Sequence, residues 1–153
     1  MLIRALSDYH YVGETRSKLM DFYKQASLLF DKKLYKEAEQ VILKAKQEAF
    51  DREAFLELIK LNRLYVWVLK TMNVGTTNRQ ALYQLNEENE EALEKLPNYL
   101  KFEKLAMRAG ELHQKYSQSR GKSFRKEIEE FLKHPLLKNP EQALSNSAKI
   151  AYY

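Results

Sequence analysis

The stretch LYKEAEQVILKAKQEA at residues 34–49 decides the fold. Its residues Ala38, Ile42, Ala45 and Ala49 recur at intervals of four, three and four, which is the spacing of one face of an α-helix. Most of this face is alanine, and small side chains let a neighbouring helix approach closely. The stretch therefore predicts a helix over residues 35–50 that packs tightly against a partner helix.

Glycine and proline are rare enough in the remaining sequence, with four Gly and three Pro, to mark where helices end. No stretch shows the alternating pattern of a strand. Thr77 and Gln80 form a capping box, and Asn139 before Pro140 caps the last helix. We therefore expect helices over residues 2–11, 15–31, 35–50, 52–73, 77–96, 98–118, 123–133 and 140–153.

The segment from Phe22 to Ala45 resembles a tetratricopeptide repeat, a pair of antiparallel helices with small and large residues at fixed places. The matching positions are Phe22, Ala26, Leu29, Tyr35, Ala38, Ile42 and Ala45. The chain is also similar to longer, uncharacterised bacterial helical-repeat proteins. The resemblance implies an all-α array of antiparallel helix pairs, an α-solenoid fragment of about seven helices. Residues 1–153 would then be a single helical-repeat domain and part of a longer array.

Composition excludes several classes of protein. The chain has no cysteine, which excludes disulfide frameworks, cysteine-based zinc sites and thiol nucleophiles. No run of 18 apolar residues exists, and the first residues lack the apolar core of a signal peptide, so we expect a cytoplasmic protein without membrane contact. Its net charge is +5, with both signs interspersed, as on a solvated helical surface.

Neither a metal motif nor a catalytic motif is present. The histidines His10, His113 and His134 form no His-Glu-x-x-His pattern, and Glu130 with His134 offers two ligands at most. The glutamates of residues 87–94 follow the outside of a predicted helix, so we expect them to be solvated. Glycine-rich phosphate loops and Gly-x-Ser-x-Gly are missing. We therefore expect no enzymatic activity, no cofactor and no metal.

The resemblance implies a scaffold that binds a protein or peptide on the surface lined by the first helices of successive pairs. In the matched pair this is the helix over residues 15–31, whose polar positions Arg16, Tyr23 and Lys24 are the candidate contacts. The last helix ends in Ile150, Tyr152 and Tyr153, an apolar end that predicts either docking on the core or self-association.

An alternative function is nucleic-acid binding by residues 112–126, LHQKYSQSRGKSFRK, which contain no acid. Basic residues with interleaved aromatics can hold a single strand by phosphate contacts and stacking. Tyr116 and Phe124 also continue the apolar faces of the neighbouring predicted helices. In that case both are core residues, and the segment is an exposed basic loop that binds no nucleic acid. The candidate phosphate contacts are Lys115, Arg120, Lys122, Arg125 and Lys126.

The run Leu64-Tyr65-Val66-Trp67-Val68-Leu69 is apolar on all sides of its predicted helix. Such a helix is either central and covered on every side or carries an external interface. We expect Trp67 to be largely buried in either case.

Overall fold

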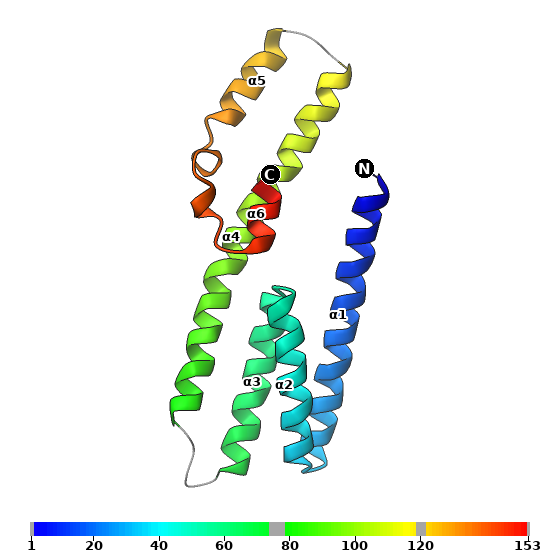
Figure 1. The fold of residues 1–153 in the computed structure, drawn as a ribbon, viewed down its shortest axis with the longest axis vertical. Helices are drawn as coiled ribbons and strands as arrows, with labels where there is room; N and C mark the ends of the chain where they lie inside the picture. Colours follow the sequence, from blue (N-terminus) through cyan, green and yellow to red (C-terminus); the bar gives the residue numbers. More distant parts are fainter. Residues whose placement is uncertain (1, 74–78, 119–121, 153) are drawn as a thin grey trace. The chain divides into compact units, whose positions relative to one another are not determined.

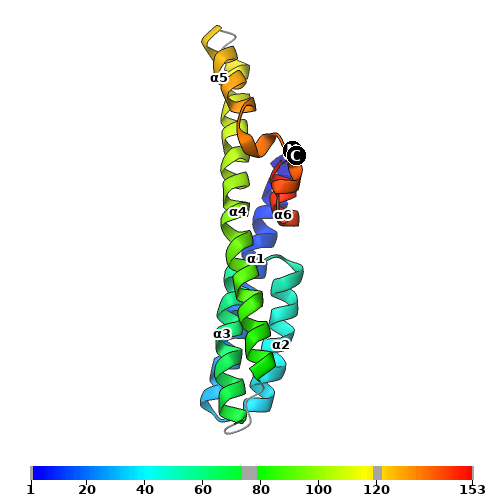
Figure 2. The same cartoon turned by 90° about the vertical axis from the view of Figure 1, so that its left-hand side faces the viewer.

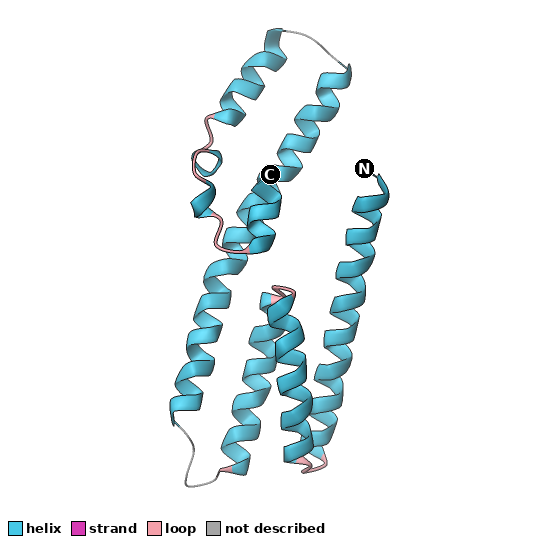
Figure 3. Ribbon diagram, in the orientation of Figure 1, coloured by secondary structure: helices cyan, strands magenta, loops and turns pink. Residues whose placement is uncertain are grey.

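The computed structural model describes the backbone of residues 2–73, 79–118 and 122–152, and within these ranges it describes the side chains outside residues 2–13, 15, 116–118 and 122–124. The described residues form helices and turns, with no strand among them (Figures 1 and 3). The α-helices are α1 (Leu2–Asp31), α2 (Tyr35–Asp51), α3 (Phe55–Met72), α4 (Arg79–Gln118), α5 (Lys122–Leu132) and α6 (Asn146–Tyr152), and the short 3-10 helices are η1 (Pro135–Leu137) and η2 (Pro140–Gln142).

The expected all-helical class is confirmed, but the described chain has six α-helices and not about seven. Two pairs of expected helices are continuous in the structure: residues 2–11 with 15–31 in α1, and the helix before Pro97 with the helix after it in α4. A lone glycine costs only about 1 kcal/mol in a helix, so α1 continues through Gly13. Helix α4 continues through Pro97, whose ring removes one backbone hydrogen bond without ending the helix here.

The chain divides into two compact units, Met1–Leu93 and Glu94–Tyr153, and the division falls inside α4. In the first unit α1, α2 and α3 pack side by side (Figures 1 and 2). Its core contains Ala26, Ala38, Ile42 and Val68, all fully buried, so the expected burial of the alanine face of α2 is confirmed. The alanines allow α1 and α3 to approach α2 closely.

The two turns of this unit share one hydrogen-bond pattern. Leu34 N–H donates to the Leu29 carbonyl at 2.9 Å, and Ala54 N–H donates to the Ala49 carbonyl at 2.8 Å. Lys33 precedes the first of these donors with φ 61°, and Glu53 precedes the second with φ 51°. Each helix therefore ends in a Schellman motif, which closes the α1–α2 and α2–α3 turns within a few residues.

The second unit has its own core around Phe102, Ala143 and Ala148. Asn98 of α4 holds the segment between η2 and α6. Its Nδ2 donates to the Gln142 carbonyl at 2.9 Å, and its Oδ1 accepts from Leu144 N–H at 3.0 Å. These two bonds hold the segment extended. The expected single helix over residues 140–153 is therefore interrupted between η2 and α6.

The predicted cap at Asn139 exists, since its Oδ1 accepts from Glu141 N–H at 2.9 Å, but it opens only the short helix η2. Helix α6 begins later, where Ser145 Oγ accepts from Ala148 N–H at 3.1 Å. The predicted capping box of α4 includes Thr77, which lies outside the described residues.

Candidate functional site

A groove between α1 and α3 is the best candidate site in the first unit. It is a hollow of about 240 Å³. Leu19 and Leu61 are buried side chains at its base, and the more accessible Met20, Tyr23 and Lys60 stand along its edges. Helical spacing explains the α1 side, because residues three and four positions apart share one face.

One ion pair borders the groove. Arg16 Nε on α1 lies 3.8 Å from Glu57 Oε1 on α3, and Glu57 also lines the groove. Of the three candidate contacts predicted from sequence, Tyr23 lines the groove and Arg16 borders it through this pair. Lys24 is exposed and lies 4.0 Å from Asp21 on its own helix, outside the groove lining.

The groove contains further residues that the sequence reasoning did not single out. Leu19, Met20, Glu57, Lys60 and Leu61 come from two helices, and only the packing of α1 against α3 brings them together. The i, i+1, i+4 grouping of Leu19, Met20 and Tyr23 was a usable signal on α1. The sequence contains no comparable signal that shows which face of α3 packs against α1.

A polar network joins α2, α3 and α4 within the first unit. Asn62 Nδ2 donates to Glu88 Oε2 at 3.1 Å and to Asn89 Oδ1 at 2.9 Å, although Asn62 is fully buried. Lys46 Nζ lies 2.8 Å from the same Glu88 oxygen and 5.5 Å from the ring centre of Tyr65. Glu88 is thus the one glutamate of this acidic stretch that points into the unit, whereas its neighbours are exposed as predicted.

Two groups in this unit have shifted pKa values. Burial, aided by a 2.8 Å hydrogen bond to Glu39, raises the pKa of Tyr65 to about 12. A hydrogen bond from Lys18, together with the charge of Arg52, lowers the pKa of Glu48. Both shifts arise from contacts that hold helices together, and neither group lies in the groove.

Trp67 lies on the outward face of α3, so the expectation that it is largely buried is wrong. Its side chain is 64% exposed, so it is not a core residue. Helices α1 and α2 pack on α3, Asn62 turns toward α4, and Trp67 lies on the side that none of these contacts covers. The exposed residues of α3 all share this face, which we call the α3 basic stripe: Leu56, Lys60, Arg63, Trp67 and Lys70.

The alternative nucleic-acid segment is only partly described. The side chains of Tyr116, Arg120, Lys122 and Phe124 lie outside the described residues. Arg125 and Lys126 are exposed on α5, and Lys115 Nζ lies 3.4 Å from Glu127 Oε1. Arg108 pairs with the same Glu127 oxygen at 3.0 Å, so Glu127 partly neutralises the charges of Lys115 and Arg108.

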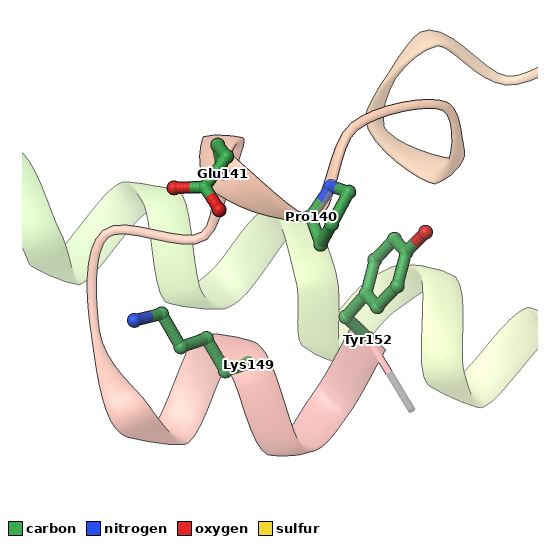
Figure 4. Close-up of a pocket in the computed structure, with 4 residues that line it drawn as sticks. All are labelled: Pro140, Glu141, Lys149 and Tyr152. Carbon is green, nitrogen blue, oxygen red and sulfur yellow. The ribbon is translucent and has the colours of Figure 1, made fainter.

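The second unit contains a small pocket between η2 and α6, shown in Figure 4. It is lined by Pro140, Glu141, Lys149 and Tyr152. The Tyr152 hydroxyl donates to the Leu137 carbonyl at 3.0 Å, and its ring meets Phe102 edge-on at 6.2 Å. Tyr152 therefore fixes α6 within its unit.

The remaining sequence predictions concern metals, membranes and the C-terminal end. His134 Nδ1 accepts from Leu136 N–H at 3.3 Å and caps η1. Among the described side chains, no three His, Cys, Asp or Glu residues are arranged to hold a metal ion. None of the helices in the described ranges is both long and apolar enough to cross a bilayer. Ile150 is 78% exposed, and Tyr153 and the His10 side chain lie outside the described residues.

Comparisons with known proteins give no relative. The chain matches no protein-family model, no curated protein and no solved structure. Any function of the groove therefore has to be inferred from its own residues.

Proposed function

We propose that the protein is a non-enzymatic interaction scaffold that binds a protein segment in the groove between α1 and α3. The observation that carries the proposal is a small hollow with a leucine base, Leu19 and Leu61, and with Met20 accessible at its edge. An accessible apolar hollow with polar edges is typical of a site that accepts one or two anchoring side chains of a partner.

Size and chemistry favour a peptide over a metabolite or a cofactor. Ligand pockets are usually roughly 300–1,000 Å³ and enclose most of their ligand, whereas this groove measures about 240 Å³. Its charged side chains are Glu57 and Lys60, of which Glu57 is engaged by Arg16. These groups can orient a peptide by hydrogen bonds at the edge while an apolar side chain fills the base.

The same proposal includes the tetratricopeptide-like arrangement. Helices α1 and α2 would form one helix pair, and α3 with the part of α4 up to Leu93 would form the next. The groove would then lie between the first helices of successive pairs, where helical-repeat scaffolds bind extended segments. Arg16 and Tyr23 keep their predicted role as partner contacts under this proposal.

The test is a selection of peptides from a random display library on the immobilised protein. We expect selected peptides to share a large apolar residue and to bind Met20→Glu at least about tenfold more weakly, because a carboxylate there would be desolvated by the anchor. Leu28→Glu is the matched control, since Leu28 is an exposed apolar residue of the same helix outside the groove. Peptides that bind both variants equally well, or a selection that yields no binder, would contradict the proposal.

A further inference from the structure

Charge is segregated between α3 and the first part of α4, although the two signs are mixed over the chain as a whole. From Leu58 to Met72 the sequence contains three cations and no acid. From Tyr83 to Leu93 it contains four glutamates and no cation. Two successive helices of one unit therefore carry opposite charges.

The cations of α3 lie on its exposed stripe. Lys60, Arg63 and Trp67 are spaced i, i+3, i+7 and span about 10 Å of helix. The described residues provide no ion pair for Lys60, Arg63 or Lys70. Among the described residues, the stripe thus presents three unpaired positive charges around a tryptophan that is mostly in water.

Helix α4 has a complementary face, which we call the α4 acidic stripe: Tyr83, Glu87 and Glu90. Counted backward from Glu90, these residues have the same spacing as Lys60, Arg63 and Trp67, and all three are exposed. Only Glu88 turns inward, to Lys46 and Asn62. Within one chain, therefore, neither stripe covers the other.

We propose that the α3 basic stripe of one copy binds the α4 acidic stripe of a second copy of this chain. When the two helices run antiparallel, the equal spacing places Lys60 and Arg63 of one copy opposite Glu90 and Glu87 of the other. Trp67 then lies opposite Tyr83. Because the chain has a net charge of +5, copies repel each other in most orientations. Opposed stripes are the orientation in which local attraction replaces this repulsion.

A second copy fits this surface better than a nucleic acid does. Phosphates would be attracted by the cations of α3, but the exposed glutamates Glu87 and Glu90 belong to the same unit and would repel a polyanion. An acidic stripe of matching length meets the cations without bringing further negative charge over the rest of the unit. The chain itself supplies such a stripe.

The experiment measures molecular mass by analytical ultracentrifugation over a wide concentration range, at low and at high salt. We expect the original chain to associate as concentration rises and to dissociate at high salt, where charges are screened over only a few ångströms. Lys60→Glu with Arg63→Glu should weaken association by about tenfold or more, because like charges then face each other. Glu87→Lys with Glu90→Lys should have the same effect.

The decisive sample is a mixture of these two double variants. In the mixture the reversed α3 stripe of one variant meets the reversed α4 stripe of the other, so association should return. Lys32→Glu with Lys36→Glu is the matched control for the α3 double variant, since it lowers the net charge by the same amount at exposed positions outside both stripes. Circular-dichroism melting of each variant checks that it is folded.

Three results would overturn the proposal. The first is a chain that stays monomeric at low salt and high concentration, whether or not it binds a single-stranded oligonucleotide through the α3 cations. The second is association that neither double variant weakens. The third is a mixture of variants that stays dissociated while both remain folded. Met20→Glu should not change the mass, so this proposal and the groove proposal can fail separately.

Discussion

Replacing Asn62 by aspartate removes the donor that holds α4 against α3 while keeping the shape of the side chain. Asn62 is fully buried, and its Nδ2 donates to Glu88 Oε2 at 3.1 Å and to Asn89 Oδ1 at 2.9 Å. In the variant an oxygen takes the place of this nitrogen. Three acceptor oxygens then meet without a proton between them, and two of them belong to carboxylates.

The expected loss of stability follows from these contacts. Each lost hydrogen bond costs about 1 kcal/mol, and a buried charge without a partner of its own adds a larger penalty, so we expect a total of about 3–5 kcal/mol at neutral pH. Lys46 is already 2.8 Å from Glu88, so its charge is shared between two carboxylates. For a chain of this size, a loss of 3 kcal/mol lowers the melting temperature by about 6–12 °C.

The loss should depend on pH in a defined direction. Burial beside Glu88 raises the pKa of the introduced carboxyl above its value of about 3.9 in the unfolded chain. The penalty is therefore complete above the raised folded-state pKa and shrinks as the pH falls through it toward the unfolded value. The protonated carboxyl can again donate a hydrogen bond to Glu88, as the amide does in the original chain.

The assay is thermal unfolding followed by circular dichroism at neutral pH and near pH 4. Asn86→Asp is the matched control, because Asn86 Nδ2 also donates to a glutamate, Glu90, at 2.8 Å but on the exposed face of α4. We expect the control to lose about 0.5 kcal/mol at most. Equal melting temperatures for the two variants, or an Asn62→Asp loss that is the same at both pH values, would refute the buried network.

Three further predictions follow from burial and exposure. Ala38→Leu should destabilise the chain by about 1–3 kcal/mol, because Ala38 has no exposed surface in the core, whereas Glu37→Leu, exposed on the same helix, should change the melting temperature little. Trp67 should emit at the long wavelength of a hydrated indole and be quenched by iodide, and a blue-shifted, protected spectrum would contradict its exposure. Tyr65 should ionise near pH 12, so its bond to Glu39 stabilises the fold fully below pH 10 and is lost as the pH rises from about 10 to 12; the ultraviolet titration of Tyr65→Phe should lack this late step.

The alanine face of α2 could be predicted from sequence because the information is local. Four small or apolar residues at helical spacing define both the helix and its buried side, and the structure buries all of them. The polar network was not predictable in this way. Asn62 meets Glu88 and Asn89 across 26 and 27 residues of sequence, and no local pattern selects these partners.

Trp67 shows a different limit of sequence reasoning. An all-round apolar segment is expected to be covered on every side, but coverage depends on how many helices surround it. Here α1 and α2 pack on α3 and Asn62 reaches α4, which leaves one open side. A better signal was the spacing of Lys60, Arg63 and Lys70, because three cations on one helical face indicate the side that water reaches.

The balance of charge over the whole chain conceals how the charge is arranged along it. Neighbouring helices of opposite sign would normally neutralise each other through side-chain pairs, and the net charge would then describe the surface adequately. Glu88 of α4 is paired in this way, but its cation is Lys46 of α2 and not a residue of the α3 basic stripe. The charges of α3 and of the α4 acidic stripe are therefore directed outward, where they act on whatever approaches. Because such fields orient an encounter before contact and weaken with salt, salt dependence and charge reversal are the measurements that reveal what this surface binds.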